Sequence, residues 1–260
     1  FGTAGCNLAC KFCQNWDISK SKDMDRLMDS ASPQEIAQAA KRYGADAVAY
    51  TYNDPVVFAE YAIDTALACR EQGIRNVAVT AGYIHPEPAR EFFAVMDAAN
   101  IDLKAFTDGF YHKLCVAHLQ PVLDTLAYVH HETDCWLEIT TLLIPGQNDS
   151  PQEISELATW VAKELGPDVP LHFSAFHPDW KMRDIPATPP ATLARARSIA
   201  MEAGLHYAYT GNVHDKAGDE TLCPACRKPV IQRDWYRILG YALDETGHCR
   251  HGGAKVAGRY

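Results

Sequence analysis

Three cysteines, Cys6, Cys10 and Cys13, lie within eight residues in the segment CNLACKFC. Thiolates bind zinc and iron–sulfur clusters. Structural zinc takes four ligands, usually as two cysteine pairs a dozen or more residues apart, and no second pair lies near this one. A four-iron cluster with three protein ligands keeps one iron open to a small molecule. The spacing therefore favours a [4Fe-4S] cluster, with a three-thiolate zinc site or a redox switch as alternatives.

The composition is that of a globular protein and disfavours a nucleic-acid partner. The chain has 260 residues, 47% of them apolar, which suits one sizeable α/β core and a small appendage. Its formal net charge of −9 makes nucleic acid an unlikely ligand. We find no membrane-spanning run and no secretory signal, so we expect a cytoplasmic protein. Because the sequence begins at Phe1, we expect a further amino-terminal segment in the complete polypeptide.

Strand-like and helical segments alternate along the chain, which predicts βα units and a parallel sheet. Ser32, Pro33 and Glu35 predict a capped helix start, and Gly44 predicts its end. If the first residues, FGT, finish a strand, the fold class is α/β, a partial (βα)6 TIM-like barrel. We expect strands at 46–52, 76–80, 101–106, 135–144, 171–176 and 206–210, and further helices at 56–72, 87–99, 120–131, 151–165 and 189–203.

The barrel is expected to span residues 1–211 and a compact two-stranded module residues 212–260, because the alternation stops near Gly211. Chemistry in parallel α/β folds collects at the carboxyl ends of the strands. Polar residues at those ends are therefore candidate site residues. In IPGQND, 144–149, we expect only a turn at Gly146 and a helix cap at Asn148 or Asp149.

The cysteine segment resembles the CxxxCxφC loop of the radical S-adenosylmethionine (SAM) enzymes, with Phe12 as the aromatic residue before the last cysteine. In that superfamily the loop follows the first strand of a partial barrel. The resemblance implies that Cys6, Cys10 and Cys13 hold a [4Fe-4S] cluster whose open iron binds SAM. It also implies reductive cleavage of SAM to methionine and a 5′-deoxyadenosyl radical that abstracts hydrogen.

The resemblance also indicates residues that contact the cofactor. Tyr52, Asn53 and Asp54 stand where related enzymes have Gly-Gly-Glu, so Asn53 or Asp54 is expected to accept a hydrogen bond from the methionine amine; helix capping is the alternative. Thr80 ends the next strand and is a weaker candidate. Three further candidates, each with a structural alternative, are Asp102 and Lys104 of the DLK motif, which could form an ion pair, and His177, which could be a structural hydrogen-bonding residue.

Over nearly the whole chain, segments such as YTYNDPVVFAEYAIDTA, LEITTLLIPGQNDS and HFSAFHPD resemble the radical enzymes of the AmmeMemoRadiSam system, relatives of pyruvate formate-lyase activating enzymes. This implies an activase-like, oxidoreductase-type enzyme with an unidentified substrate. It implies a flavodoxin- or ferredoxin-like low-potential electron donor, and other proteins of that system, as partners. The alternative is a cysteine-rich metal-binding adaptor with a catalytically idle barrel.

A second cysteine group lies near the carboxy terminus, where Cys223 and Cys226 form one CxxC and Cys249 follows at a zinc-ribbon separation. The family pattern would finish with a second CxxC, but residue 252 is Gly. We expect Zn²⁺ with His251, or less favourably His248, as fourth ligand. A second iron–sulfur cluster and simple thiol packing are the alternatives. The remaining cysteines are expected to be buried, inert thiols: Cys69, Cys115 and Cys135.

Overall fold

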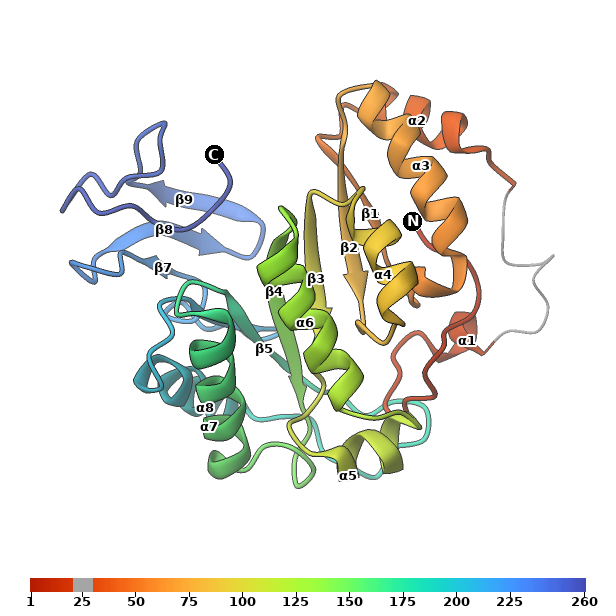
Figure 1. Cartoon of the computed structure of the whole chain (residues 1–260). Helices are drawn as coiled ribbons and strands as arrows, with labels where there is room; N and C mark the ends of the chain where they lie inside the picture. Colours follow the sequence, from red (N-terminus) through yellow and green to blue (C-terminus); the bar gives the residue numbers. More distant parts are fainter. Residues whose placement is uncertain (21–29) are drawn as a thin grey trace. The chain divides into compact units, whose positions relative to one another are not determined.

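The chain folds as an α/β protein whose parallel strands follow one another across the sheet in chain order. The computed structural model describes residues 1–20 and 30–260. Six strands form one sheet in the order β1 to β6 (Figure 1). This confirms the predicted α/β class with a parallel sheet. The strands are β1 (Ala47–Tyr50), β2 (Arg75–Thr80), β3 (Ala98–Asp102), β4 (Trp136–Leu143), β5 (Leu171–Ala175) and β6 (Ala208–Gly211).

Helices separate successive strands and cover their buried face. In β4 buried and half-buried residues alternate along the whole strand, as expected for a strand with one face against helices. α3 packs on β2, and α8 packs on β5 and β6. The helical segments are α1 (Trp16–Ser19), α2 (Pro33–Arg42), η2 (Pro55–Phe58), α3 (Ala59–Glu71), α4 (Pro86–Phe93), α5 (Asp108–Phe110), η3 (Tyr111–Cys115), α6 (Gln120–Glu132), α7 (Pro151–Trp160), η4 (Val161–Leu165) and α8 (Pro190–Glu202).

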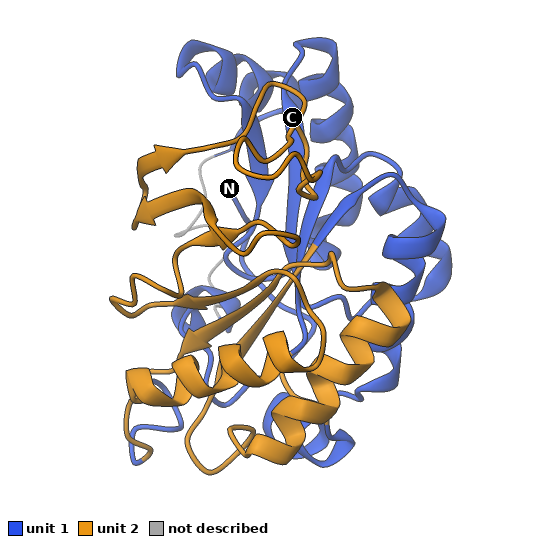
Figure 2. Ribbon diagram, turned by 90° about the vertical axis from the view of Figure 1, so that its left-hand side faces the viewer, with its two compact units in different colours: residues 1–103, 107–137, 178–184 blue, residues 104–106, 138–177, 185–260 orange. Residues whose placement is uncertain are grey.

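The chain divides into two compact units (Figure 2). The first comprises residues 1–103, 107–137 and 178–184, and the second comprises residues 104–106, 138–177 and 185–260. The second unit holds both the last strands of the parallel sheet and the carboxy-terminal strands. The domain boundary that the sequence suggests near residue 212 stays a prediction. No helix in the described ranges is both long and apolar enough to cross a membrane.

In the first unit, the start of the chain lies beside β1. The amino group of Phe1 donates to the carbonyl of Ala49 at 2.7 Å, and the N–H of Thr51 donates to the carbonyl of Phe1 at 2.9 Å. The Phe1 ring lies 5.3 Å from the Tyr50 ring, centroid to centroid. Phe1 therefore lies hydrogen-bonded beside β1, and the interpretation of FGT as the end of a strand stays a prediction.

The predicted third strand of the sheet, 101–106, is placed wrongly, since β3 covers Ala98–Asp102. Burial continues to alternate beyond the strand, with Leu103 and Ala105 both buried. Pairing stops earlier because β2 itself ends at Thr80, which is opposite Ile101. The alternation of buried residues therefore extends beyond the last hydrogen-bonded residue of the strand.

The carboxy-terminal module has three strands, so the expected two-stranded module is wrong. They are β7 (Thr221–Leu222), β8 (Pro229–Asp234) and β9 (Arg237–Tyr241), and they pair antiparallel in that order. β7 has only two residues and an irregular register with β8. A strand this short leaves no period-two pattern in the sequence.

The start of α2 is fixed by the predicted capping box, so we expect Ser32→Ala to destabilise the protein by about 1 kcal/mol. The Ser32 hydroxyl accepts from the N–H of Glu35 at 3.3 Å, and the Glu35 carboxylate accepts from the N–H of Ser32 at 2.7 Å. Urea unfolding followed by circular dichroism measures the effect. Ser198→Ala is the matched control, because Ser198 lies exposed within α8, where Ala is the better helix former. Equal unfolding midpoints for the two variants would contradict the capping role.

Candidate cofactor site and carboxy-terminal thiol cluster

The amino-terminal cysteine loop is anchored by backbone hydrogen bonds within the first unit. The N–H of Ala9 donates to the carbonyl of Cys115 at 2.9 Å, and the N–H of Lys11 donates to that of Leu114 at 2.8 Å. These bonds attach the middle of the loop to the end of η3. The loop therefore has a fixed path that does not depend on a metal.

The three loop cysteines differ in burial and in polar contacts. Cys10 is buried, whereas Cys6 and Cys13 are half-buried. The Cys6 sulfur accepts from the N–H of Leu8 at 3.4 Å, and the Cys13 sulfur lies 3.5 Å from the Ser19 hydroxyl. Among the described residues, these cysteines are not a group whose ligand atoms all lie within 4.8 Å. A single ion needs such closeness, whereas a cluster binds each thiolate at a different iron, so the donor set fits the cluster better.

Side chains hold the loop from both sides. The ring of Phe12 is buried, with its centroid 5.7 Å from that of Phe110. The three thiols therefore project from a loop whose backbone is tied at several points. The ties from asparagine side-chain N–H groups to backbone carbonyls are Asn7 to Tyr83, Asn15 to Tyr52 and Asn53 to Thr3.

Asn53 lies just beyond β1. The nitrogen of its side-chain amide has a hydrogen-bond partner, whereas the oxygen has none among the described residues. Its N–H group bonds the cysteine loop at Thr3. Its Oδ1 is buried and has no hydrogen-bond partner among the described residues. An unpaired buried acceptor costs about 1–3 kcal/mol, so such an atom commonly awaits a donor from a ligand. The preceding residue, Tyr52, is 60% exposed and has a left-handed φ of 74°.

Asp54 is used by the protein itself. Its buried carboxylate accepts from the N–H of Val56 at 3.1 Å, which caps η2. It also accepts from the Thr80 hydroxyl at 2.9 Å and from the N–H of Ala81 at 2.8 Å. The N–H of Gly82 in turn donates to the Thr80 hydroxyl at 3.1 Å. Asp54 and Thr80 therefore join the ends of two strands, a link that sequence reasoning missed.

The other three predicted cofactor contacts lie at strand ends, each described within its own unit. In the first unit, half-buried Asp102 is the last residue of β3, and Leu103 after it is fully buried, as expected. In the second unit, Lys104 is half-buried, and His177 is exposed just after β5. All three therefore stand at or just beyond strand ends, and their contact with the cofactor stays a prediction.

The loop after β4 shows a buried amide that the sequence reasoning did not identify. Asn148 is 2% exposed and donates to the carbonyls of Lys104 at 2.7 Å and Leu142 at 2.9 Å. The cap of α7 is Ser150, so the expected cap at Asn148 or Asp149 is wrong. Gly146 has a φ of 71°, which confirms the turn. The hydrogen bonds that Asn148 donates to backbone carbonyls distinguish it from an exposed capping residue, and they are visible only in the folded structure.

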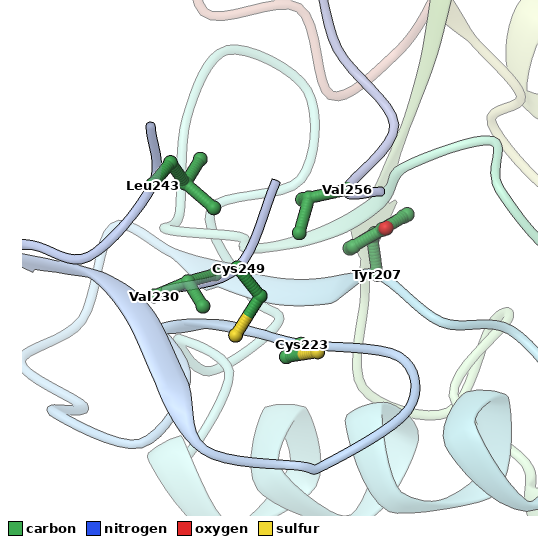
Figure 3. Close-up of a cluster of buried hydrophobic side chains, with 6 residues drawn as sticks. All are labelled: Tyr207, Cys223, Val230, Leu243, Cys249 and Val256. Atoms are coloured by element: carbon green, nitrogen blue, oxygen red, sulfur yellow. The ribbon is translucent and has the colours of Figure 1, made fainter. Parts of the chain in front are cut away.

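In the second unit, Cys223, Cys226 and Cys249 form a group whose sulfurs all lie within 4.8 Å of one another. Cys223 and Cys249 are buried in an apolar cluster (Figure 3). Cys226 packs against that cluster. Burial raises the pKa of the Cys223 thiol, but hydrogen bonds from the N–H groups of Cys226 and Ala225 outweigh it and leave that pKa lowered. A lowered thiol pKa favours the thiolate, the form that binds metal.

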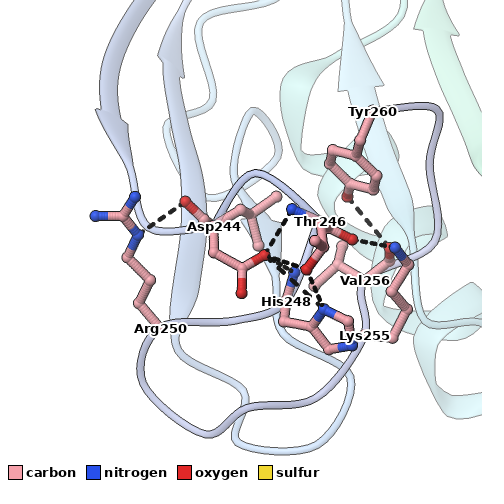
Figure 4. Close-up of polar contacts among 8 residues, drawn as sticks. Asp244, Thr246, His248, Arg250, Lys255, Val256 and Tyr260 are labelled. Carbon is pink, nitrogen blue, oxygen red and sulfur yellow. Dashed lines mark hydrogen bonds and ion pairs between the residues drawn. The ribbon is translucent and has the colours of Figure 1, made fainter.

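Neither predicted histidine belongs to this thiol group. His251 is exposed and is not a member of it. The Nδ1 of His248 lies 2.7 Å from the Thr246 hydroxyl and 3.8 Å from the Asp244 carboxylate (Figure 4). The N–H of His248, helped by Thr246, lowers the pKa of Asp244 to about 2. The ionised Asp244 carboxylate therefore anchors the backbone at His248. The remaining cysteines are buried, as predicted: Cys69, Cys115 and Cys135.

The sequence matches the family model described as the radical SAM superfamily over residues 2–158, which is more than half of the chain. The chain belongs to the radical SAM superfamily. Its cofactors are therefore a [4Fe-4S] cluster and SAM, and the predicted radical SAM chemistry is confirmed at the level of the family. The matched residues include the cysteine loop and the first four strands of the sheet.

Similar proteins agree with this assignment. The chain is 41% identical over 253 residues to "Uncharacterized protein MJ0808" of Methanocaldococcus jannaschii, covering 97% of this chain and 75% of that one. It is 24% identical over 203 residues to the pyruvate formate-lyase-activating enzyme of Clostridium pasteurianum, covering 70% and 81%.

Solved structures share the fold at low identity. A domain of the pyruvate-formate lyase-activating enzyme from Bacteroides vulgatus gives a TM-score of 0.57 at 21% identity, over 65% of this chain and all of that one. Streptococcus suis SuiB bound to S-adenosylmethionine gives a TM-score of 0.64 at 15% identity, over 82% and 49%. Together with the parallel sheet, these neighbours confirm the predicted radical SAM fold.

Proposed function

We propose that this radical SAM enzyme is activase-like: it uses SAM to abstract a hydrogen atom from a substrate. When bound, the cluster and SAM supply a 5′-deoxyadenosyl radical and methionine by reductive cleavage of the sulfonium. The similarity to a pyruvate formate-lyase-activating enzyme and the resemblance to the AmmeMemoRadiSam enzymes support this proposal. A low-potential flavodoxin- or ferredoxin-like protein is the proposed electron source, and other proteins of that system are proposed partners.

In this proposal Cys6, Cys10 and Cys13 bind the cluster, on a loop whose path the hydrogen bonds to η3 fix. The buried Phe12 ring excludes water from the base of the loop. A preformed loop needs little ordering when it takes up its metal.

The observation that carries the proposal is the unpaired Oδ1 of Asn53. The same side chain donates to the carbonyl of Thr3, three residues before Cys6. The methionine amine of SAM is an ammonium group, which donates hydrogen bonds and would satisfy this acceptor. We assign Asn53 to bind that amine. Asp54 and Thr80 then act as positioning residues, because they hold the strand ends on which Asn53 sits.

The remaining polar residues at strand ends are proposed to orient the rest of SAM. Lys104 is a cation suited to the methionine carboxylate, and Asp102 is an acceptor suited to ribose hydroxyls. His177 is proposed as a further contact, since it is exposed and lies two residues beyond the end of β5. Tyr52 is exposed beside Asn53 and offers an aromatic face to the cofactor.

Reductive cleavage of SAM tests the proposal directly. We expect the anaerobically reconstituted enzyme, reduced with dithionite, to convert SAM into 5′-deoxyadenosine and methionine, as measured by liquid chromatography and mass spectrometry. A metal-binding adaptor would give neither product. Iron and sulfide analysis of the same sample shows whether a cluster is present. A protein with a full cluster and no cleavage would contradict the enzymatic function.

A further inference from the structure

Two turns in the second unit have the same hydrogen-bond pattern. At the first, the N–H of Cys223 donates to the carbonyl of Lys228, and the N–H of Arg227 donates back to the carbonyl of Cys223, both at 2.9 Å. At the second, the N–H of Cys249 donates to the carbonyl of Ala254 at 2.9 Å. The N–H of Gly253 donates back to the carbonyl of Cys249 at 2.7 Å. Both turns therefore link a cysteine to the fourth and fifth residues after it.

Backbone conformation supports the equivalence of the two turns. The fourth residue after the cysteine is left-handed in each, with a φ of 60° at Arg227 and 72° at Gly253. The third residue is Cys226 in the first turn and Gly252 in the second. Gly252 therefore occupies the position of the second thiol in a turn built like the first.

The position of Gly252 is also close to the thiol group in space. A Cβ added there would lie 3.5 Å from the Cys226 sulfur and 3.3 Å from the Cys226 Cβ, so the Cys226 side chain would have to shift by a few tenths of an ångström. Its φ is not among the left-handed glycine values, so an L-residue fits the backbone. Gly252 is exposed, whereas Cys223 and Cys249 are buried. The fourth corner of the thiol group therefore faces solvent.

The spacing of the sulfurs suits one tetrahedral ion. Zinc–thiolate bonds are about 2.3 Å long, and two tetrahedral ligands at that distance lie about 3.8 Å apart. The sulfurs of Cys226 and Cys249 are 3.8 Å apart. The N–H of Cys226 also donates to the Cys223 sulfur at 3.5 Å, which stabilises its thiolate.

We propose that Cys223, Cys226 and Cys249 bind one Zn²⁺ and that the chain leaves its fourth coordination position, beside Gly252, to an exogenous ligand. Closed zinc sites with four protein ligands are structural, whereas a site with three protein ligands accepts water or another small donor. The second unit thus holds an exchangeable metal position, formed by residues that the proposed SAM chemistry does not use. Neither His248, engaged by Thr246 and Asp244, nor exposed His251 closes the site.

Zinc K-edge X-ray absorption on the reconstituted holoenzyme in thiol-free buffer tests this, since the cluster contains no zinc. We expect one Zn per chain by elemental analysis, with three sulfur donors and one lighter donor. His251→Ala should leave the spectrum unchanged. Gly252→Cys should give four sulfur donors and at least about tenfold tighter binding in chelator competition, because even outer-shell partners change metal affinity 10–100-fold.

Gly252→Ser is the matched control, because it adds a side chain of similar size without a thiol and should bind zinc no tighter than the unaltered enzyme. The proposal is overturned if the holoenzyme lacks stoichiometric zinc or holds a Cys226–Cys249 disulfide. It is also overturned if His251→Ala removes an imidazole signal, or if Gly252→Ser tightens binding as much as Gly252→Cys. The unaltered enzyme alone gives a decisive spectrum, even if a variant folds poorly.

Discussion

Replacing Cys10 with Ala is expected to abolish conversion of SAM into 5′-deoxyadenosine. Cys10 is the most buried of the three loop thiols, and a cluster held by two thiolates has lost a third of its protein ligands. Without a cluster, no electron reaches the sulfonium. The anaerobic assay with dithionite measures the product, and iron analysis measures cluster content. We expect both to fall to background.

Cys135→Ala is the control for Cys10→Ala. Both are buried thiols changed to the same residue, but Cys135 lies just before β4, where its N–H donates to the Thr133 hydroxyl at 3.2 Å, outside the proposed cluster-binding loop. This variant is expected to keep its cluster and its cleavage activity, with a modest loss of stability from the small cavity. Retained cleavage in Cys10→Ala, or equal loss in both variants, would refute the cluster assignment.

Replacing Asn53 with Ala is expected to weaken SAM binding by about tenfold to a hundredfold. Hydrogen bonds to charged groups contribute about 1.5–3 kcal/mol, and 1.4 kcal/mol corresponds to a tenfold change in affinity. The proposed bond joins the buried Oδ1 to the methionine amine. Equilibrium dialysis with labelled SAM measures Kd. Asn53→Asp keeps an acceptor and should bind more tightly than Asn53→Ala.

A separate control is needed because Asn53 also ties down the loop through Thr3. Asn15→Ala removes a comparable tie, the bond to the carbonyl of Tyr52, without touching the proposed amine site. We expect Asn15→Ala to bind SAM within a few-fold of the unaltered enzyme at equal iron content. If it binds as weakly as Asn53→Ala, loop anchoring explains the loss and the assignment of Asn53 fails.

The substrate can be identified by tracing the hydrogen atom that is abstracted from it. A deuterated candidate that is the true substrate should pass its label into 5′-deoxyadenosine, because abstraction forms a new carbon–deuterium bond there. Under the activase-like proposal, a protein substrate is the first candidate to test. Uptake of label from a small molecule instead would keep the radical chemistry and exclude the activase role.

Much of the fold follows from local sequence signals. Ser32, Pro33 and Glu35 specify the start of α2, since a capping box depends on neighbouring residues alone. The strand pattern likewise locates most of the sheet within a few residues. β3 is placed wrongly because its end depends on where β2 stops, which no local pattern records. β7 is too short to leave a pattern at all.

The candidate site was predictable only as far as its chemistry lies in residue type and spacing. The loop cysteines carry their own signal. The sequence does not show which of Asn53 and Asp54 is available to a ligand, because both are acceptors in the same short segment before Pro55. Only the tertiary structure shows that the Asp54 carboxylate is occupied by Ala81 and Thr80. The sequence similarly offered His251 as a metal ligand, since it cannot tell which way an exposed loop presents its side chain.

The anchoring of the cysteine loop bears on oxygen tolerance. The bonds from Ala9 and Lys11 to η3 and the ties from the asparagine side chains involve no sulfur. Air that destroys the inorganic core therefore leaves the surrounding polypeptide in place. Damage should be repairable by supplying ferrous iron and sulfide alone, without refolding the protein.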